Sequence, residues 1–148
     1  MITGKKGILI IEEFEGFEPK MYKDAVGLPT IGYGTLIDTK EEQWLKTAII
    51  TKDQAEVLLR RELGMIERNL NVMLKKTITQ NQFDALVSFA YNLGIANLRS
   101  STLLKKVNRN PADTTIRDEF MKWVHAGGKV LKGLQTRRKA EADLYFKK

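Results

Sequence analysis

The segment EGFEPKMYKDAVGLPTIGYG, residues 15–34, decides how this chain is interpreted. Two acidic residues, Glu15 and Asp24, precede a glycine-spaced run that begins at Thr30. Aromatic and β-branched residues among glycines and prolines are typical of short strands joined by tight turns. The sequence therefore predicts a small antiparallel sheet within residues 17–37.

The sequence on both sides of this segment predicts helices. Residues 3–15 form the first, with Thr3 as its N-cap and Gly16 in the left-handed position after its end. A short helix follows at 39–47, and capping-box patterns at 51–54 and 79–82 begin two longer helices, the first of which reaches about residue 76. The remaining helices are predicted at 100–108, 114–124 and 137–146, with a loop at Gly127, Gly128 and Gly133 before the last. The fold class is therefore α+β, with helix dominant.

A chain of 148 residues corresponds to one domain. Within it, we expect residues 15–50 to form a small β-containing lobe. The long helix at 51–77 is predicted to connect this lobe to a helical lobe made of residues 1–14 and 78–148. A core of this size needs no disulfide or metal to fold.

The composition excludes several classes of chemistry. The chain has no cysteine and a single histidine, His125, so thiol catalysis, cysteine-ligated zinc and two-histidine metal motifs are excluded. The first apolar run, Ile8–Ile11, is too short for a signal-peptide core, and no run approaches the ~20 apolar residues of a membrane span. We therefore expect no metal, no cofactor and no stable membrane insertion. The chain is expected to be made as a soluble cytoplasmic protein or cut from a longer precursor.

The net charge of +7 is unevenly distributed. Residues 1–50 hold 6 Lys and Arg against 8 Asp and Glu, whereas residues 51–148 hold 19 against 10. This excess indicates either a solvated helical surface or attraction to an anionic polymer, and Arg137 and Arg138 are assigned to that surface. The basic runs lack interleaved aromatic residues and the chain has no nucleic-acid motif, so nucleic acid is not an expected partner.

The two acids suggest glycosidic-bond cleavage, which uses one protonated and one ionised carboxyl group. Glu15 suits the acid, because Phe14 and Phe17 flank it and the negative end of a helix disfavours its ionisation. Asp24, in a polar turn, is expected to stay ionised, and the Thr30 hydroxyl is suited to hold a water. Taken alone, the same residues are also compatible with surface charges on a plain β-hairpin.

Further motifs follow along the chain. They are Glu42–Leu45, Gln82–Gly94, Ser101–Leu104, Gly127-Gly128, Gly133-Leu134 and Arg137-Arg138. Together with Phe14–Gly34, they make nearly the whole chain resemble the phage-type lysozymes, or endolysins, of glycoside hydrolase family 24. The family's Glu–Asp–Thr catalytic spacing falls on Glu15, Asp24 and Thr30 without a gap.

The resemblance implies a lysozyme-like fold with a cleft between two lobes. It implies hydrolysis of the β-1,4 bond between N-acetylmuramic acid and N-acetylglucosamine in peptidoglycan, with inversion at the anomeric carbon. Glu15 would be the acid, Asp24 the base and Thr30 the residue that positions water. The implied partners are peptidoglycan glycan strands and a holin or similar pore that releases the protein from the host cytoplasm to the wall. We expect a monomer.

Family alignment also suggests residues that bind substrate. Leu36 and Tyr91 should line the cleft, with Ser101 or Thr102 opposite. Each has an alternative: Leu36 as sheet core, Tyr91 as helix packing, and Ser101 or Thr102 as a helix cap. Elsewhere, Trp123 is predicted in the core and His125 on the surface.

One residue departs from the family pattern. Thr35 stands where the family usually has a histidine, which puts one stabilising charged contact in doubt but not the chemistry. Two other functions compete with hydrolysis. A lytic transglycosylase would use Glu15 but need no base, and a basic module would bind the wall or nucleic acid without cutting it.

Overall fold

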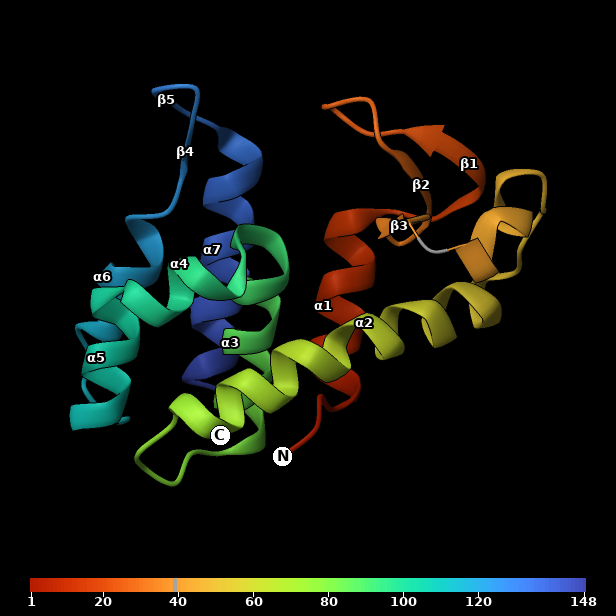
Figure 1. The fold of residues 1–148 in the computed structure, drawn as a ribbon. Helices are drawn as coiled ribbons and strands as arrows, with labels where there is room; N and C mark the ends of the chain where they lie inside the picture. The colour runs from red at the N-terminus through yellow and green to blue at the C-terminus, as the bar shows by residue number, and fades with distance from the viewer. Residues whose placement is uncertain (39) are drawn as a thin grey trace. The chain divides into compact units, whose positions relative to one another are not determined.

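The computed structural model describes residues 1–38 and 40–148 (Figure 1). The chain divides into two compact units, one of residues 11–65 and one of residues 1–10 and 66–148. Helices α1 (Lys5–Glu15) and α2 (Lys52–Met73) contribute residues to both units. Among the described residues, none of the helices has the length and apolar character of a membrane span.

The unit of residues 11–65 contains the predicted sheet. Its strands are β1 (Glu18–Lys23), β2 (Pro29–Gly32) and β3 (Thr35–Leu36), antiparallel in that order, which confirms the sheet expected within 17–37. Tyr22 lies opposite Thr30, and Thr30 lies opposite Leu36. Because directly opposed residues share a face of the sheet, these three side chains form a row across it.

The turn between β2 and β3 requires its two glycines. Gly32 and Gly34 have φ of +68° and +83°, a region that residues with a Cβ rarely occupy. A Cβ on Gly32 would also lie 3.1 Å from the Cβ of Ala55. The two glycines therefore let Tyr33 turn into the unit, where its side chain is buried.

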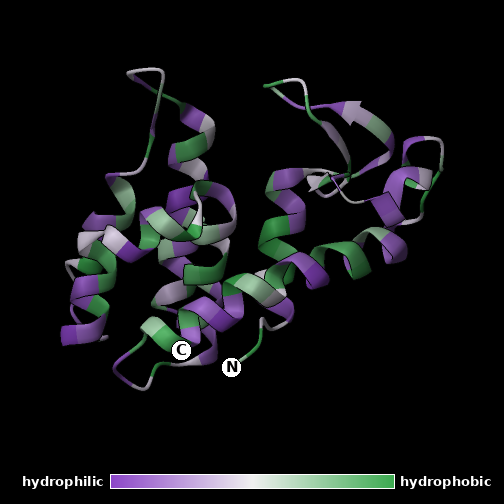
Figure 2. Cartoon of the chain, viewed as in Figure 1, coloured by the Kyte–Doolittle hydropathy of each residue, from purple (hydrophilic) through white to green (hydrophobic). Residues whose placement is uncertain are grey.

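A short helix and the start of α2 complete this unit. Helix η1 (Lys40–Lys46) is of the 3-10 type and buries Leu45. Thr39, the first residue of the helix predicted at 39–47, lies outside the described residues. The predicted capping box at the start of α2 is confirmed: the Thr51 N–H donates to the Gln54 side chain at 2.8 Å, and the Gln54 N–H donates to the Thr51 hydroxyl at 3.1 Å. Figure 2 shows hydrophobic and hydrophilic residues alternating along α2, as an amphipathic helix requires.

The second unit is built around helix α3 (Gln80–Leu93), which begins with the predicted capping box at Thr79. Residues 83–90 of α3 are all buried, and its largest partner is α7 (Lys132–Tyr145). The surrounding helices are α4 (Ile95–Ser100), α5 (Thr102–Arg109) and α6 (Ile116–Met121). Trp123 packs with its ring 5.5 Å from that of Phe89 but is only half-buried, so it lies at the edge of the core and not within it as predicted.

Three predictions of secondary structure in this unit were wrong. Helix α4 was missed because Gly94, which ends α3, also serves as the N-cap of α4. The glycine loop is instead a hairpin of β4 (His125–Ala126) and β5 (Lys129–Val130), because Gly127 and Gly128 both take positive φ and suit a type I′ turn. Helix α7 begins at Lys132, five residues before the predicted start at 137, and includes Gly133.

The assignment of Arg137 and Arg138 to surface charge was also wrong. They are 4% and 0% exposed, and both pair with Glu141, which is 0% exposed. Ser88 on α3 donates to Glu141 at 2.6 Å. The arginines are buried because they lie on the face of α7 that packs on α3, where Glu141 balances their charge.

The predicted N-cap of α1 is replaced by a residue distant in sequence. The Thr3 hydroxyl donates to Glu67 at 2.6 Å instead of capping the helix. Asp84 on α3 accepts the N–H of Gly4 at 2.9 Å and that of Gly7 at 3.1 Å. One carboxylate thus satisfies two N–H groups at the start of α1 and ties that helix to α3.

We expect Gly7→Ala to destabilise the protein, although alanine is the better helix former. A Cβ at Gly7 would lie 2.8 Å from the Cβ of Asp84 and 2.8 Å from Thr3 Cγ2. Displacing Asp84 weakens the cap, so the free energy of unfolding should fall by about 1–3 kcal/mol in urea denaturation. Gly133→Ala in α7 is the matched control: its Cβ would meet nothing within 4 Å, so no loss is expected. Equal stability of the two variants would contradict the cap.

Candidate active site

Glu15 is the last residue of α1 and is half-buried. Gly16 follows with φ of +74°, and its N–H donates to the carbonyl of Glu12 at 3.0 Å. The left-handed glycine ends the helix and turns the chain toward β1. Glu15 therefore stands at a fixed helix terminus, as the sequence predicted.

Asp24 lies in the turn between β1 and β2, where its own backbone holds the carboxylate. Its Oδ1 accepts the N–H of Val26 at 3.0 Å and that of Leu28 at 2.9 Å. The Asp24 N–H in turn donates to the carbonyl of Leu28 at 2.9 Å. These bonds fix the direction of the carboxylate and occupy Oδ1.

Thr30 lies on β2 and is 2% exposed. Its hydroxyl donates to the carbonyl of Leu28 at 3.0 Å. Leu28 thus links the two predicted residues, because its N–H binds Asp24 and its carbonyl binds Thr30. With its proton engaged, the Thr30 oxygen is oriented to accept a hydrogen bond.

Tyr22 is a residue of this site that the sequence analysis left without a role. Burial raises the pKa of its phenol, and the negative charges of Glu15, Glu18 and Asp24 raise it further. Glu15 and Asp24 therefore both lie close enough to act on one phenol, which also stands opposite Thr30. In the sequence, this role could have been inferred from the position of Tyr22 on a predicted strand, two residues before Asp24.

The four predicted substrate-binding residues fall in different units. Leu36 is 39% exposed in the same unit as Glu15, directly opposite Thr30 on the sheet. Tyr91, Ser101 and Thr102 belong to the other unit. The Ser101 hydroxyl caps α5: it accepts the Leu104 N–H at 3.0 Å and donates to the Leu98 carbonyl at 2.7 Å. This confirms the helix-cap alternative for Ser101, while substrate binding by all four residues stays a prediction.

Thr35, the residue that departs from the family pattern, is 1% exposed on β3. Within the described part of the chain, its hydroxyl oxygen has no hydrogen-bond partner. A buried hydroxyl without a partner costs free energy. The Thr35 hydroxyl is therefore energetically unfavourable in the otherwise apolar interior around Ile31 and Ile37.

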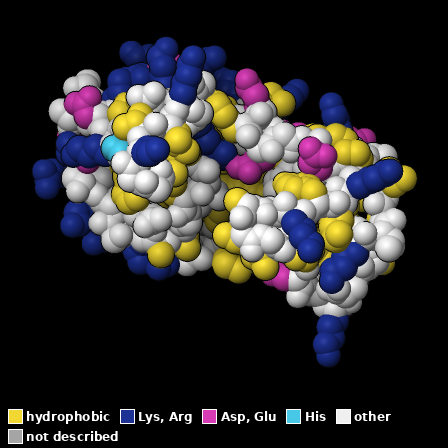
Figure 3. Space-filling view, turned by 90° about the horizontal axis from the view of Figure 1, so that it is seen from above, with side chains coloured by type: hydrophobic (Ala, Val, Ile, Leu, Met, Phe, Trp, Pro, Cys, Tyr) yellow, Lys and Arg dark blue, Asp and Glu magenta, His cyan; other side chains and the backbone are white. Residues whose placement is uncertain are grey.

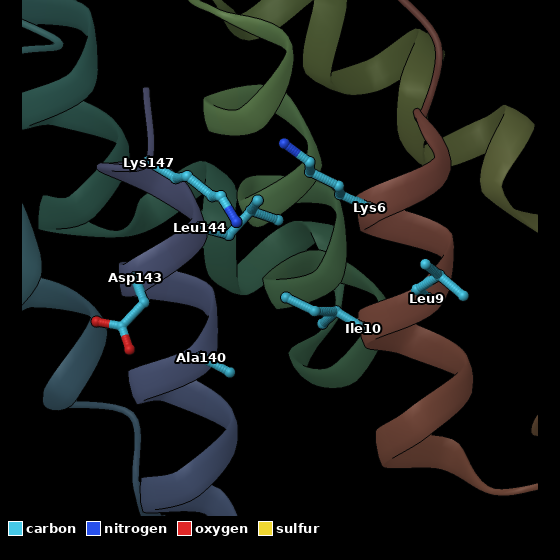
Figure 4. Close-up of a pocket in the computed structure, with 7 residues that line it drawn as sticks. All are labelled: Lys6, Leu9, Ile10, Ala140, Asp143, Leu144 and Lys147. Atoms are coloured by element: carbon cyan, nitrogen blue, oxygen red, sulfur yellow. The ribbon is translucent and has the colours of Figure 1, made fainter.

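A separate pocket of about 410 Å³ lies in the other unit, between the start of α1 and the end of α7 (Figure 4). Its walls are mainly aliphatic, with Lys6 and Lys147 at the rim. Asp143 points away from α1 and pairs with Arg117 at 2.8 Å. This pocket lacks the paired carboxyls that glycosidic cleavage uses, so it is not the candidate active site.

His125 lies on the surface, as predicted, among Lys and Arg side chains (Figure 3). It belongs to the unit that carries the excess of basic residues. Glu15, Asp24 and Thr30, in contrast, all belong to the unit of residues 11–65.

Comparisons with known proteins agree on one family. Residues 12–141 match the family model described as phage lysozyme. The endolysin of Bacillus phage PZA is 41% identical over 151 residues, covering 98% of this chain and 55% of the relative. The chain thus spans about half the length of that relative.

Solved structures agree with the family model. The endolysin from Escherichia coli O157:H7 phage FAHEc1 has a TM-score of 0.87 and 37% identity, covering 99% of this chain and 94% of that one. The muramidase domain of SpmX from Asticaccaulis excentricus has a TM-score of 0.84 and 32% identity, covering 98% and 97%.

These matches define an α+β protein with the lysozyme-like fold. Because the family model covers most of its residues, the chain belongs to the phage lysozyme family.

Proposed function

We propose that this protein is a muramidase that hydrolyses the β-1,4 bond between N-acetylmuramic acid and N-acetylglucosamine in peptidoglycan. Membership of the phage lysozyme family supports this proposal, as does the likeness to a muramidase domain. The observation that carries it is the convergence of Glu15 and Asp24 on Tyr22, with Thr30 next to Tyr22 on the sheet.

Glu15 is the proposed general acid. It donates its proton to the glycosidic oxygen as the bond to the anomeric carbon breaks and positive charge develops on the sugar ring. It lies at the end of α1, where Gly16 turns the chain toward β1. After the reaction, Glu15 is left as a carboxylate.

Asp24 and Thr30 are proposed to hold the attacking water. Asp24 Oδ1 already accepts two backbone N–H groups, so Oδ2 is the oxygen that would accept one proton of the water. The Thr30 hydroxyl donates to Leu28 and would accept a hydrogen bond from the other proton. A water held by both protons directs a lone pair at the anomeric carbon. Attack with Asp24 as base, on the face opposite the departing oxygen, inverts that carbon.

The remaining expectations belong to the same proposal. Leu36, Tyr91, Ser101 and Thr102 are proposed to contact the glycan, Leu36 through the sheet face that it shares with Thr30. The net charge of +7 favours approach to the anionic wall. We propose that the protein acts as a monomer in host-cell lysis and reaches the wall from the cytoplasm through a holin or similar pore.

The products of purified peptidoglycan test the proposal. Digestion should release fragments with reducing-end N-acetylmuramic acid, identified by mass spectrometry. Anhydro ends would instead indicate a lytic transglycosylase, which retains Glu15 as acid but removes the water-activating role of Asp24. Intact wall after incubation would reject a cutting enzyme and favour a binding module.

Asp24→Asn should lower kcat by at least about 100-fold, because asparagine cannot take the proton of the water. The amide oxygen can still accept the N–H groups of Val26 and Leu28, so the turn and the melting temperature should be kept. Turbidity loss of cell-wall suspensions measures the rate, and Asp38→Asn, at an exposed residue, is the control. Near-normal turnover by the Asp24 variant would exclude it as the base.

A further inference from the structure

The pocket between α1 and α7 has no part in the proposed reaction. Its volume is about 410 Å³, and its lining comes from the first turns of α1 and from the end of α7 (Figure 4). All of these residues belong to the unit of residues 1–10 and 66–148. Small-molecule sites have volumes of roughly 300–1,000 Å³, so this pocket can hold one small ligand.

The pocket is cationic at one end and apolar along the rest. Lys6 lies one turn before Ile10 on α1, and Lys147 follows Leu144 just after the end of α7, so both lysines lie at the same end. Figure 4 shows their side chains extending toward each other across that end. Ile10, Leu144 and Ala140 supply the aliphatic surface of the remainder. The pocket therefore matches a ligand with a charged head and an apolar tail.

Helix α3 fixes both walls of the pocket. Its Asp84 accepts two backbone N–H groups in the first turn of α1, at 2.9 and 3.1 Å, and Lys6 lies in that turn. One turn earlier on α3, the Asn81 side chain donates to the backbone carbonyl of Lys147 at 3.0 Å. The backbone at both lysines is thus held in place without a ligand. Such preorganisation lowers the entropic cost of binding.

The two ammonium groups at this end have no counter-charge. Within the part of the chain that the structure describes, neither Lys6 nor Lys147 forms an ion pair or a hydrogen bond through its ammonium group. Asp143 also lines the pocket, but it points away from α1 and pairs with Arg117 at 2.8 Å. An anionic head group can therefore accept charge-assisted hydrogen bonds from both lysines without breaking an ion pair of the protein.

We propose that this pocket binds an amphiphile of the fatty-acid class, with an anionic head group and one alkyl chain. The carboxylate lies between Lys6 and Lys147, and the chain lies along Ile10, Leu144 and Ala140. The proposal goes beyond the muramidase function and does not depend on it, because every lining residue lies outside residues 11–65.

The shape of the pocket favours a free amphiphile over a membrane surface. Leu144 is only 6% exposed, so a flexible chain that enters between the helices reaches it, whereas the flat surface of a bilayer does not. The volume lies at the lower end of the range for small-molecule sites, which favours one alkyl chain over the two of a bilayer lipid.

Methyl NMR with dodecanoate tests binding. Titration below the concentration at which it forms micelles should shift the signals of Ile10, Ala140 and Leu144 with saturation. It should also raise the melting temperature, because a ligand stabilises the folded state that it binds. Val26, an exposed valine in the other unit, should not shift. Shifts without saturation, or equal shifts at Val26, would overturn the site.

Two further ligands separate the contributions of head and tail. Dodecyltrimethylammonium has the same chain with a cationic head group, and acetate has the carboxylate without the chain. Neither should shift the methyl signals of the pocket at the concentrations at which dodecanoate does. Equal binding of the cationic amphiphile would overturn the role of the lysines, and equal binding of acetate would overturn the role of the apolar surface.

Lys6→Gln combined with Lys147→Gln should raise the Kd for dodecanoate by at least about 10-fold, because both charged donors are lost. The matched control is Lys5→Gln with Lys148→Gln, which removes two charges from exposed neighbours outside the lining. Its Kd should stay near the wild-type value. Equal losses in the two double variants would show attraction by net charge alone and overturn the site.

Ala140→Met places a longer side chain in the apolar part of the pocket and retains both lysines. Its Kd for dodecanoate should also rise by at least about 10-fold, because the side chain takes the space of the alkyl chain. An unchanged Kd would show that the chain does not lie along α7, and the proposal would fail.

Other occupants of the pocket are tested directly. Sedimentation velocity should show a monomer. A dimer, with Ile10 and Leu144 signals that shift with protein concentration, would assign the pocket to a second copy of the chain and overturn the proposal. Vesicles of phosphatidylglycerol that shift these signals, while monomeric dodecanoate does not, would assign it to a lipid surface and overturn the proposal as well.

Discussion

Replacing Glu15 with glutamine is expected to lower kcat for peptidoglycan hydrolysis by about 10⁴-fold, the upper end of the range for loss of a general acid. Glutamine has nearly the same shape but no proton to give to the leaving oxygen. The end of α1 should stay intact, because Gly16 in the left-handed region ends the helix whichever of the two side chains precedes it. Turbidity assays and product analysis measure the loss, and circular dichroism checks the fold.

Glu18→Gln is the matched control, since Glu18 is an exposed carboxylate that also acts on Tyr22. Its kcat should remain within a few-fold of the wild type. If Glu15→Gln and Glu18→Gln lost activity equally, the local negative field and not proton donation would explain the effect. Full activity in Glu15→Gln would require another residue as the acid.

Glu141→Ala is expected to cause the largest loss of stability. It leaves the guanidinium groups of Arg137 and Arg138 buried beside each other, with the Ser88 hydroxyl deprived of its acceptor. Removing one partner of a buried ion pair typically costs about 3–5 kcal/mol, because the remaining charge is uncompensated. The free energy of unfolding in urea measures this loss. If the variant does not fold, Glu141→Gln, which still accepts from Ser88, provides the measurement.

Asp143→Ala tests whether the loss of stability expected for Glu141→Ala requires a buried ion pair or follows from the loss of any ion pair. Asp143 lies on the same helix and pairs with Arg117 at 2.8 Å, but both side chains are substantially exposed, at 54% and 40%. Exposed pairs contribute about 1 kcal/mol or less, so this variant should be nearly as stable as the wild type. A double-mutant cycle of Arg138→Ala with Glu141→Ala should show a smaller loss than the sum of the single variants. Additive losses would contradict direct coupling.

Local signals predicted much of this structure. The sheet of β1, β2 and β3 followed from glycines and β-branched residues close in sequence, and the capping boxes at Thr51 and Thr79 need only four residues each. The glycine after Glu15 fixed the end of α1 in the same way. The α+β fold class was confirmed by the lysozyme-like structural matches.

Features that depend on distant residues were not predictable. Nothing near Gly4 in the sequence indicates that Asp84, 80 residues away, accepts the N–H group of Gly4. Arg137 and Arg138 resemble a solvated basic run until α3 is packed against them, and only then does Glu141 become their partner. Sequence spacing located the candidate carboxyls but gave no information about the residues that hold them.

The cap that Asp84 supplies to α1 also bears on the order of events during synthesis. The unit of residues 11–65, which contains Glu15, Asp24 and Thr30, is continuous in sequence, so all of it has been synthesised before Asp84 is added. The first turn of α1 must wait until Asp84 has been translated, because its N–H groups have no local acceptor of this kind. All residues of the candidate site are therefore in the chain before the start of α1 can receive its cap.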